Sequence, residues 1–282
     1  MDLQDFNKLD KEAASKMLFS CCGSTNWVKQ VMEHFPFRDE SSLVAVAEDT
    51  WYNKCTEVDW RESFTHHPKI GDVKSLTEKF AGKEQAAVGT ASVEVIEALA
   101  KANQAYEEKH GFIFIVCATG KSAEEMLRLL NDRLKNSVAE ELSIAMGEQH
   151  KISIIRFKKM LDTGNWSFLK VSQVTTHVLD TSIGRPGKDI SIRMKEYRNN
   201  SWQTITQGVT NADGRIADLL PPSRCIQPGH YKMVFETGEY FKANNLQGFY
   251  PVVEIDFSIF DNTHYHVPLL INPFGYSTYR GS

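Results

Sequence analysis

The sequence predicts two domains of different fold class, a helical N-terminal domain followed by an all-β sandwich. With 282 residues, the chain exceeds the roughly 100 to 200 residues of a typical domain. Its apolar residues recur every three or four positions as far as Leu161, and every second position from Val174 onward. Turn residues without a clear period lie between these stretches. We therefore expect an all-α domain at 1–161, a linker at 162–172 and a β domain at 173–282.

Composition and charge exclude several classes of protein. Hydrophobic residues make up 41% and charged residues 24% of the chain, as in ordinary soluble proteins. The net charge of -4 gives no general attraction to nucleic acid or anionic membrane. No stretch reaches the roughly 18 uninterrupted apolar residues of a membrane span, and the N-terminus lacks a secretory layout. We expect a cytoplasmic protein; a peroxisomal location is the alternative, although no convincing internal targeting segment is found.

The cysteines indicate reduced thiols. They are five in number and scattered without a CxxC pair, so they suggest neither a disulfide framework nor a zinc site. Adjacent Cys21 and Cys22 could be redox active, but packed thiols are the favoured interpretation.

Helix starts and helical spacing justify the first domain. Ser122 with Glu125, and Ser137 with Glu140, have the spacing of capping boxes. The apolar run at 111–120 is too short for an independent helix. It predicts a buried strand, or an extended segment whose backbone amides face a ligand. The helical period is carried by Val93, Ile96, Leu99, Ala102 and Tyr106, and by Met126, Leu127, Leu130 and Leu134.

Polar residues interrupt this helical pattern. Pro68 biases His67 toward an extended backbone. Glu84 and Gln85 open a predicted long helix, and Arg156 lies on the last one. Taken singly, His67 is most simply a helix cap, the Glu-Gln pair a solvated first turn, and Arg156 a partner of a surface acid.

With the sequence words around them, these residues resemble the OHCU decarboxylase family over nearly the whole domain. That family removes CO2 from 2-oxo-4-hydroxy-4-carboxy-5-ureidoimidazoline (OHCU) to give S-allantoin. One departure is that the stretch between Asp72 and Glu84 is shorter than usual, and a serine that often precedes the Glu-Gln pair is not evident. The matching words lie at 21–27, 60–72, 84–85, 103–106, 111–122, 133–136 and 148–152.

The resemblance implies a catalytic role for His67, which would steer the departing carboxylate or deliver a proton. It implies that Arg156 holds a carbonyl or carboxylate with its planar guanidinium. Because the substrate can delocalise the carbanion left by CO2 loss, no cofactor is expected. Backbone groups of 114–118 would complete the cradle, and the residues implied to bind substrate are Pro68, Glu84, Gln85, Ile115, Cys117 and Ala118.

Period-two alternation and turn residues justify the second domain. Turns are predicted at 211–214, 221–222, 228–229 and 237–238. Several short strands in about 110 residues are typical of a sandwich. The alternating apolar residues are Ile190, Ile192 and Met194, then Tyr231, Met233 and Phe235, then Val253, Ile255, Phe257 and Ile259.

Polar residues of this domain fall where strands would gather them. His264 and His266 share one strand face, while Tyr265 and its alternating neighbours fill the opposite face. His177 starts the first predicted strand, and Arg215 follows a turn. Core histidines satisfied by hydroxyl groups are the alternative interpretation.

This domain resembles 5-hydroxyisourate hydrolase, the enzyme branch of the transthyretin fold. Hormone-carrying transthyretin shares the fold but lacks the terminal tetrapeptide and these histidine and arginine positions. The matching words lie at 176–180, 184–187, 211–215, 249–251, 264–270 and 279–282.

The resemblance implies that His177 and His264 activate water, with His266 as a supporter on the same face. Arg215 and Arg280 would bind carbonyl oxygens. Ser282 would align the water or a histidine through its hydroxyl or its terminal carboxylate. Tyr279 and Gly281 complete the implied substrate-binding tail. The family forms its sites across subunits of a homotetramer, and the decarboxylase domains could pair as dimers.

In this order the two halves resemble the bifunctional allantoin synthase family of urate degradation. The predicted function is hydrolysis of 5-hydroxyisourate to OHCU, followed by stereospecific decarboxylation to S-allantoin, without metal or organic cofactor. The alternative is a transthyretin-like ligand-binding or signalling scaffold without turnover. Neither nucleic acid nor a membrane is an expected partner.

Overall fold

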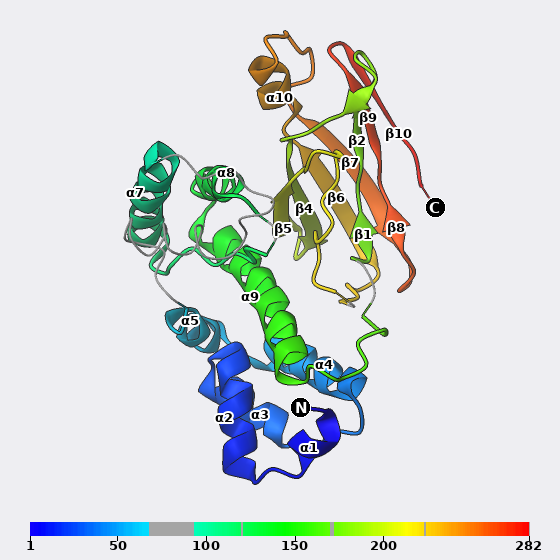
Figure 1. The fold of residues 1–282 in the computed structure, drawn as a ribbon. Coiled ribbons are helices and arrows are strands. Elements are labelled where there is room, and N and C mark those ends of the chain that lie inside the picture. The colour runs from blue at the N-terminus through cyan, green and yellow to red at the C-terminus, as the bar shows by residue number, and fades with distance from the viewer. Residues whose placement is uncertain (68–92, 120, 170–171, 223, 282) are drawn as a thin grey trace. The chain divides into compact units, whose positions relative to one another are not determined.

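The computed structural model describes residues 1–67, 93–119, 121–169, 172–222 and 224–281. It divides into two compact units, Met1–Phe168 and Leu169–Ser282. Helices build the first unit and strands build most of the second (Figure 1), so the predicted change of fold class is confirmed. None of the helices in the described ranges is long and apolar enough to cross a membrane.

Capping residues define most helices of the first unit. The capping boxes at Ser122 and Ser137 are both present, which confirms the predicted helix starts. The predicted start of the long helix at Glu84 and Gln85 lies outside the described residues. The described helices are α1 (Leu3–Asn7), α2 (Lys11–Cys22), α3 (Thr25–Met32), α4 (Glu40–Asp49), the π-helix η1 (Thr50–Lys54), α5 (Glu57–Thr65), α7 (Val93–His110), α8 (Ala123–Arg133) and α9 (Val138–Met160).

Helix α9 organises the core of the helical unit. Its Phe157 stacks on Trp27 of α3 with ring centroids 6.1 Å apart, and Trp51 donates through Nε1 to the carbonyl of Met146 at 3.0 Å. The same helix also buries polar side chains, among them Gln149 and Ser153. A helix at the centre of a core buries polar groups only where they find hydrogen-bond partners. Gln149 and Ser153 therefore indicate a polar cluster inside this core.

The second unit is a sandwich of two four-stranded sheets with a two-stranded ladder. One sheet has the order β5-β4-β6-β7 and the other β10-β9-β2-β3, while β1 pairs with β8 in parallel. Its elements are β1 (Val174–Thr175), β2 (Val178–Asp180), β3 (Arg185–Pro186), β4 (Ser191–Arg198), β5 (Ser201–Val209), β6 (Gly229–Phe235), α10 (Thr237–Ala243), β7 (Val253–Ile259), β8 (Tyr265–His266), β9 (Leu269–Asn272) and β10 (Gly275–Thr278).

The predicted alternation of this unit is confirmed, since the inward residues of β4, β6 and β7 belong to one buried cluster. One predicted turn is wrong. Thr237 and Gly238 begin the helix α10, which buries Tyr240 and Phe241 against the sandwich core. A side chain at Gly238 would meet Pro251 Cα at 2.9 Å. The turn-like Thr-Gly pair therefore reflects close packing at a helix start.

Candidate active sites

The C-terminus of α2 is the meeting point of the candidate decarboxylase residues. Gly23 ends this helix with a φ of 83°, and its N–H donates to the Phe19 carbonyl at 2.7 Å. A Cβ at this position would lie 3.0 Å from the Cβ of His66. Glycine is thus required both for the left-handed turn and for the close approach of the end of α5.

Three residues of α9 bind the last carbonyl groups of α2. Gln149 donates to Cys22 at 3.2 Å, Ser153 donates to Cys21 at 3.3 Å, and Arg156 Nη1 donates to Cys21 at 3.2 Å. The spacing of these residues, four and then three positions, places them on one face of α9. Helix-terminal carbonyls lack intrahelical partners, so α9 satisfies them.

His67 joins this cluster through Gln149, because His67 Nε2 lies 2.5 Å from Gln149 Oε1. The structure therefore connects His67, through Gln149, and Arg156, directly, to adjacent carbonyl groups at the end of α2. Gln149 is the residue that sequence reasoning missed as their connection. Its signal was the spacing of 149, 153 and 156, which places three polar side chains on one face of the last predicted helix. Three predicted binding residues, Pro68, Glu84 and Gln85, lie outside the described residues.

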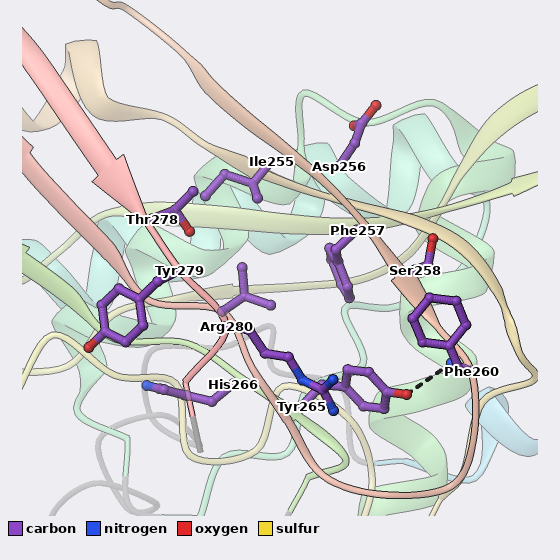
Figure 2. Close-up of a pocket in the computed structure, with 11 residues that line it drawn as sticks. Ile255, Asp256, Phe257, Ser258, Phe260, Tyr265, His266, Thr278, Tyr279 and Arg280 are labelled. Atoms are coloured by element: carbon purple, nitrogen blue, oxygen red, sulfur yellow. Dashed lines mark hydrogen bonds between the residues drawn. The ribbon is translucent and has the colours of Figure 1, made fainter.

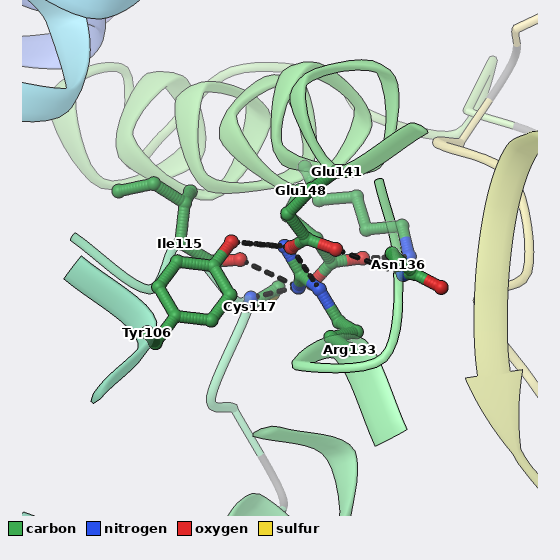
Figure 3. A network of polar contacts seen from close by, with 8 residues as sticks. Tyr106, Ile115, Cys117, Arg133, Asn136, Glu141 and Glu148 are labelled. Atoms are coloured by element: carbon green, nitrogen blue, oxygen red, sulfur yellow. Dashed lines mark hydrogen bonds and ion pairs between the residues drawn. The ribbon is translucent and has the colours of Figure 1, made fainter. Parts of the chain in front are cut away.

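A buried ionic network lies beside the extended segment that follows α7 (Figure 3). Arg133 is 2% exposed and pairs with Glu141, which is 0% exposed. The hydroxyl of Tyr106 also donates to Glu141, and Asn136 Nδ2 donates to it at 2.9 Å. This network satisfies a charge pair that would otherwise be costly to bury.

The network also holds the apolar run at 111–120, whose described residues form no strand. Arg133 Nη1 donates to the Ile115 carbonyl at 2.7 Å. The Cys117 amide donates to Glu148 Oε2 at 2.6 Å, and Lys151 pairs with the same carboxylate at 2.7 Å. The structure thus favours an extended segment over a strand, and the Cys117 amide of this segment faces the Glu148 carboxylate. The Ala118 carbonyl accepts the Lys121 amide at 3.2 Å, so each of these three predicted cradle residues has a backbone group bonded within the protein.

The cysteines are free, as predicted. Burial raises the pKa of the Cys21 thiol to about 11 and that of Cys55 to about 12. Burial also raises the pKa of Cys22. Because the thiolate is the reactive form, the neighbouring thiols Cys21 and Cys22 are packing residues.

In the sandwich unit, His177 forms an isolated antiparallel bridge with Arg215. It lies in the gap between β1 and β2, so the prediction that it starts the first strand is wrong by three residues. The strand is interrupted at Thr176, whose hydroxyl donates to the Val267 carbonyl at 2.7 Å. Burial, together with the adjacent Arg215 guanidinium, lowers the pKa of His177.

His264 and His266 share one face, as predicted, with rings nearly parallel at 13° and centroids 6.5 Å apart. Thr175 joins them, since its Oγ1 lies 2.9 Å from His264 Nε2 and 2.9 Å from His266 Nδ1. Burial lowers the pKa of His266, followed by the charges of Arg215, His264 and His177. His266 is therefore the histidine at which the other candidate groups converge. Thr175 was missed because a lone threonine in a strand carries no sequence signal.

The C-terminal tail is attached to this cluster. The Gly281 amide donates to the His266 carbonyl at 2.9 Å, and the Arg280 guanidinium lies 5.1 Å from the centre of the Tyr265 ring. His266, Tyr279 and Arg280 line a cavity of about 320 Å³, together with residues of β7. Figure 2 shows these side chains. The other predicted tail residue, Ser282, lies outside the described residues. Within the described ranges, no group of three or more His, Cys, Asp or Glu side chains is arranged to hold a metal ion.

Comparisons with known proteins agree with this division. Residues 7–158 match the OHCU decarboxylase family, and residues 174–281 match the HIUase/Transthyretin family. The uric acid degradation bifunctional protein TTL of Arabidopsis thaliana is 31% identical, and the alignment covers 93% of this chain and 96% of that protein. The chain belongs to this bifunctional family. Its helical unit is an OHCU decarboxylase domain and its sandwich unit an HIUase/transthyretin domain.

Other relatives match the sandwich unit alone. A 5-hydroxyisourate hydrolase of Mus musculus is 45% identical over 39% of this chain and 96% of its own length. Among solved structures, the crystal structure of (S)-allantoin synthase aligns at 23% identity with a TM-score of 0.45, covering 100% of each chain.

Proposed function

We propose that this chain converts 5-hydroxyisourate to S-allantoin in two consecutive reactions, each carried out by one unit. The observation that carries the proposal is the presence of two separate polar clusters in one chain that belongs to the bifunctional family. One cluster links His67 through Gln149, and Arg156 directly, to the carbonyl groups at the end of α2, and the other contains His177, His266 and the C-terminal tail. This arrangement favours turnover over a binding scaffold.

Hydrolysis of 5-hydroxyisourate opens a cyclic amide and needs a base, a positioned water and cationic donors for the developing oxyanion. His177 and His266 have lowered pKa values, so both stay neutral at neutral pH and can accept a proton. His264 is exposed beside them and shares Thr175 with His266. Arg215 and Arg280 supply the cations. Tyr279, Gly281 and Ser282 complete the tail that borders the substrate.

Decarboxylation of OHCU needs the carboxylate to be oriented and a proton to be delivered to one face of the resulting carbanion. His67 supplies the proton-transfer group, because imidazole exchanges protons near neutral pH. Arg156 supplies a planar cation for a carbonyl or carboxylate. Glu84 and Gln85 would hydrogen-bond the ureido and ring amides, and Pro68 would fix the chain direction after His67. Backbone groups of 114–118 would line the remaining side.

We also propose that the sandwich units assemble as a homotetramer. Among the described strands, β7 pairs only with β6 and β10 only with β9, so each presents an open edge. Open edges are normally covered. Exposed aromatic residues lie on or near these edges, namely Phe249, Phe260, Phe274 and Tyr276. Light scattering of the full chain would give four times the monomer mass; a monomer at micromolar concentration would contradict the assembly. Pairing of the decarboxylase units as dimers is a separate prediction.

The proposed activity is tested by generating 5-hydroxyisourate with urate oxidase and following absorbance and circular dichroism. Added wild-type protein should accelerate the decay of 5-hydroxyisourate and then of OHCU, and give optically active S-allantoin. Decay at the spontaneous rates with racemic allantoin would overturn the enzyme function and favour the scaffold.

A further inference from the structure

We propose that Gln149 is a positioning residue that acts through His67, fixing the tautomer and the orientation of its imidazole ring for decarboxylation. The inference rests on the proposed function of the helical unit and deepens it. It rests on the side-chain amide of Gln149, which contacts His67 at one end and the Cys22 carbonyl at the other. Gln149 is 0% exposed, so water does not compete for either end.

The surroundings of Gln149 decide which way its amide points. The Cys22 carbonyl lies 3.2 Å from Nε2 and can only accept a hydrogen bond, so the amide nitrogen must face it. The Ser153 hydroxyl lies 3.3 Å from the same nitrogen. That hydroxyl can direct its own hydrogen to the carbonyl of Cys21 or of Gln149, and it can accept from the amide. The Cys22 carbonyl thus places Nε2 on this side, the Ser153 hydroxyl is compatible with it, and Oε1 is left facing His67.

The orientation of the amide then determines the hydrogen on His67. An amide oxygen only accepts, so His67 Nε2, at 2.5 Å from it, must carry a hydrogen. In the neutral ring the lone pair is consequently on Nδ1. Gln149 thus selects one tautomer and sets the rotation of the ring, as partners of catalytic histidines do in other enzymes.

The Cys22 carbonyl, which accepts the hydrogen bond from Gln149, has a second donor. The Cys22 carbonyl also accepts a hydrogen bond from Ser63 of α5 at 2.5 Å. Ser63 and Gln149 therefore bind the same buried acceptor, and the Gln149 amide also contacts His67. Ser63 provides a matched control, because its loss perturbs the same carbonyl and spares the amide that faces the histidine.

The charge of the partner also matters. Gln149 is neutral, whereas a carboxylate in its place would favour the imidazolium form of His67. Among the described residues, other ionisable groups at this junction are Arg156 on α9, Glu62 on α5, which binds Thr25, His66 at the end of α5, which packs against Gly23 and Phe19, and the buried thiols of α2. Substituting Gln149 leaves all of these groups in place, so an altered pH profile of decarboxylation would report a change at His67.

The test compares three full-length variants, Gln149→Met, Gln149→Glu and Ser63→Ala, with the wild type. OHCU is generated in place, and kcat, KM and the pH profile of decarboxylation are measured. Nitrogen NMR of histidine-labelled protein, assigned with His67→Asn, reports the tautomer. Gln149→Met should lower kcat by about ten- to a hundredfold with little change in KM, because the ring loses its orientation. Gln149→Glu should move the pH profile upward by about one unit, whichever protonation state is active.

Ser63→Ala should keep the His67 signals and the pH profile of the wild type. If the wild type decarboxylates OHCU while Gln149→Met and Gln149→Glu keep its kcat, pH profile and His67 signals, the positioning role is wrong. If the wild type is inert toward OHCU but Gln149→Met changes the His67 tautomer signals, the contact is supported and the decarboxylase function is overturned. The two failures are therefore distinguishable.

Discussion

The helical unit holds its candidate catalytic histidine with buried groups, whereas the sandwich unit places most of its candidates at strand ends and on an exposed tail. His67 is fixed through Gln149 to a helix terminus that α9 has already satisfied. In the sandwich, Arg215, His264 and Arg280 are exposed, and the described tail residues are attached by the bridge from Gly281 to His266 and by the contact of Arg280 with the Tyr265 ring. The first site is thus shaped within one copy of its unit, while the second leaves surface for another copy to cover.

Removing His67 should have the largest effect, because it should abolish one of the two reactions and leave the other intact. His67→Ala should lower OHCU decarboxylation by about a thousandfold, the range of a positioned proton-transfer group. Hydrolysis of 5-hydroxyisourate should keep the wild-type rate. Allantoin formed by this variant should be racemic by circular dichroism. Loss of both reactions in a folded variant would contradict separate sites.

Removing the tail should have the reverse effect. A chain ending at Tyr279 loses the Arg280 cation and the Gly281 bond to His266. Hydrolysis should fall by about a hundredfold, as when an oxyanion donor is removed. Decarboxylation of OHCU supplied directly should be unchanged. Unimpaired hydrolysis would exclude the tail from the site.

Breaking the buried ion pair should test how much the pair stabilises the helical unit. Arg133→Met leaves the Glu141 carboxylate buried without its cation, so the helical unit should lose about 3–5 kcal/mol. The loss would be measured as earlier loss of helical circular dichroism in urea. The double variant Arg133→Met/Glu141→Gln should recover part of it. Equal stability of single variant and wild type would show that the pair contributes nothing.

Two glycine substitutions in the helical unit compare a constrained backbone position with an ordinary helical one. Gly23→Ala forces a left-handed φ and crowds His66, so it should destabilise the helical unit by about 1–3 kcal/mol. Gly147→Ala, within α9 and without heavy atoms within 4 Å of the added carbon, should stabilise it by about 0.5–1 kcal/mol. The same urea titration measures both. Shifts of the same sign would contradict the special role of Gly23.

The smallest expected effect concerns pH. Burial, and after it the charge of Arg215, lower the pKa values of His177 and His266, which keeps both imidazoles neutral to lower pH. Arg215→Gln should therefore raise both pKa values, by a small amount because the charge is partly screened. Proton NMR titration measures this directly. Arg198→Gln on β4 is the control and should leave both titrations unchanged; an unchanged Arg215→Gln titration would remove the guanidinium from the histidine site.

Much of the architecture was predictable because it depends on local rules. Capping boxes fixed two helix starts, and period-two alternation identified the inward faces of β4, β6 and β7. The placement of His264 and His266 on one face follows from strand geometry alone.

The rest depended on contacts between distant residues. Gln149 and His67 are 82 positions apart, and no local pattern predicts that one amide joins a histidine to a helix terminus. The predicted turn at Thr237–Gly238 was wrong for a similar reason, because packing of Tyr240 and Phe241 on the core stabilises a helix there. The backbone bonds of Ile115 and Cys117 required knowledge that Arg133 and Glu148 are buried beside them.

Mixing the two single-site variants tests the central claim most directly. His67→Ala retains the hydrolase site and the chain ending at Tyr279 retains the decarboxylase site, so neither alone should give S-allantoin from 5-hydroxyisourate at the wild-type rate. The account predicts that the mixture restores rapid formation of optically active S-allantoin. Racemic allantoin at the spontaneous rate, from two variants that each keep their remaining activity, would contradict two separate and consecutive sites.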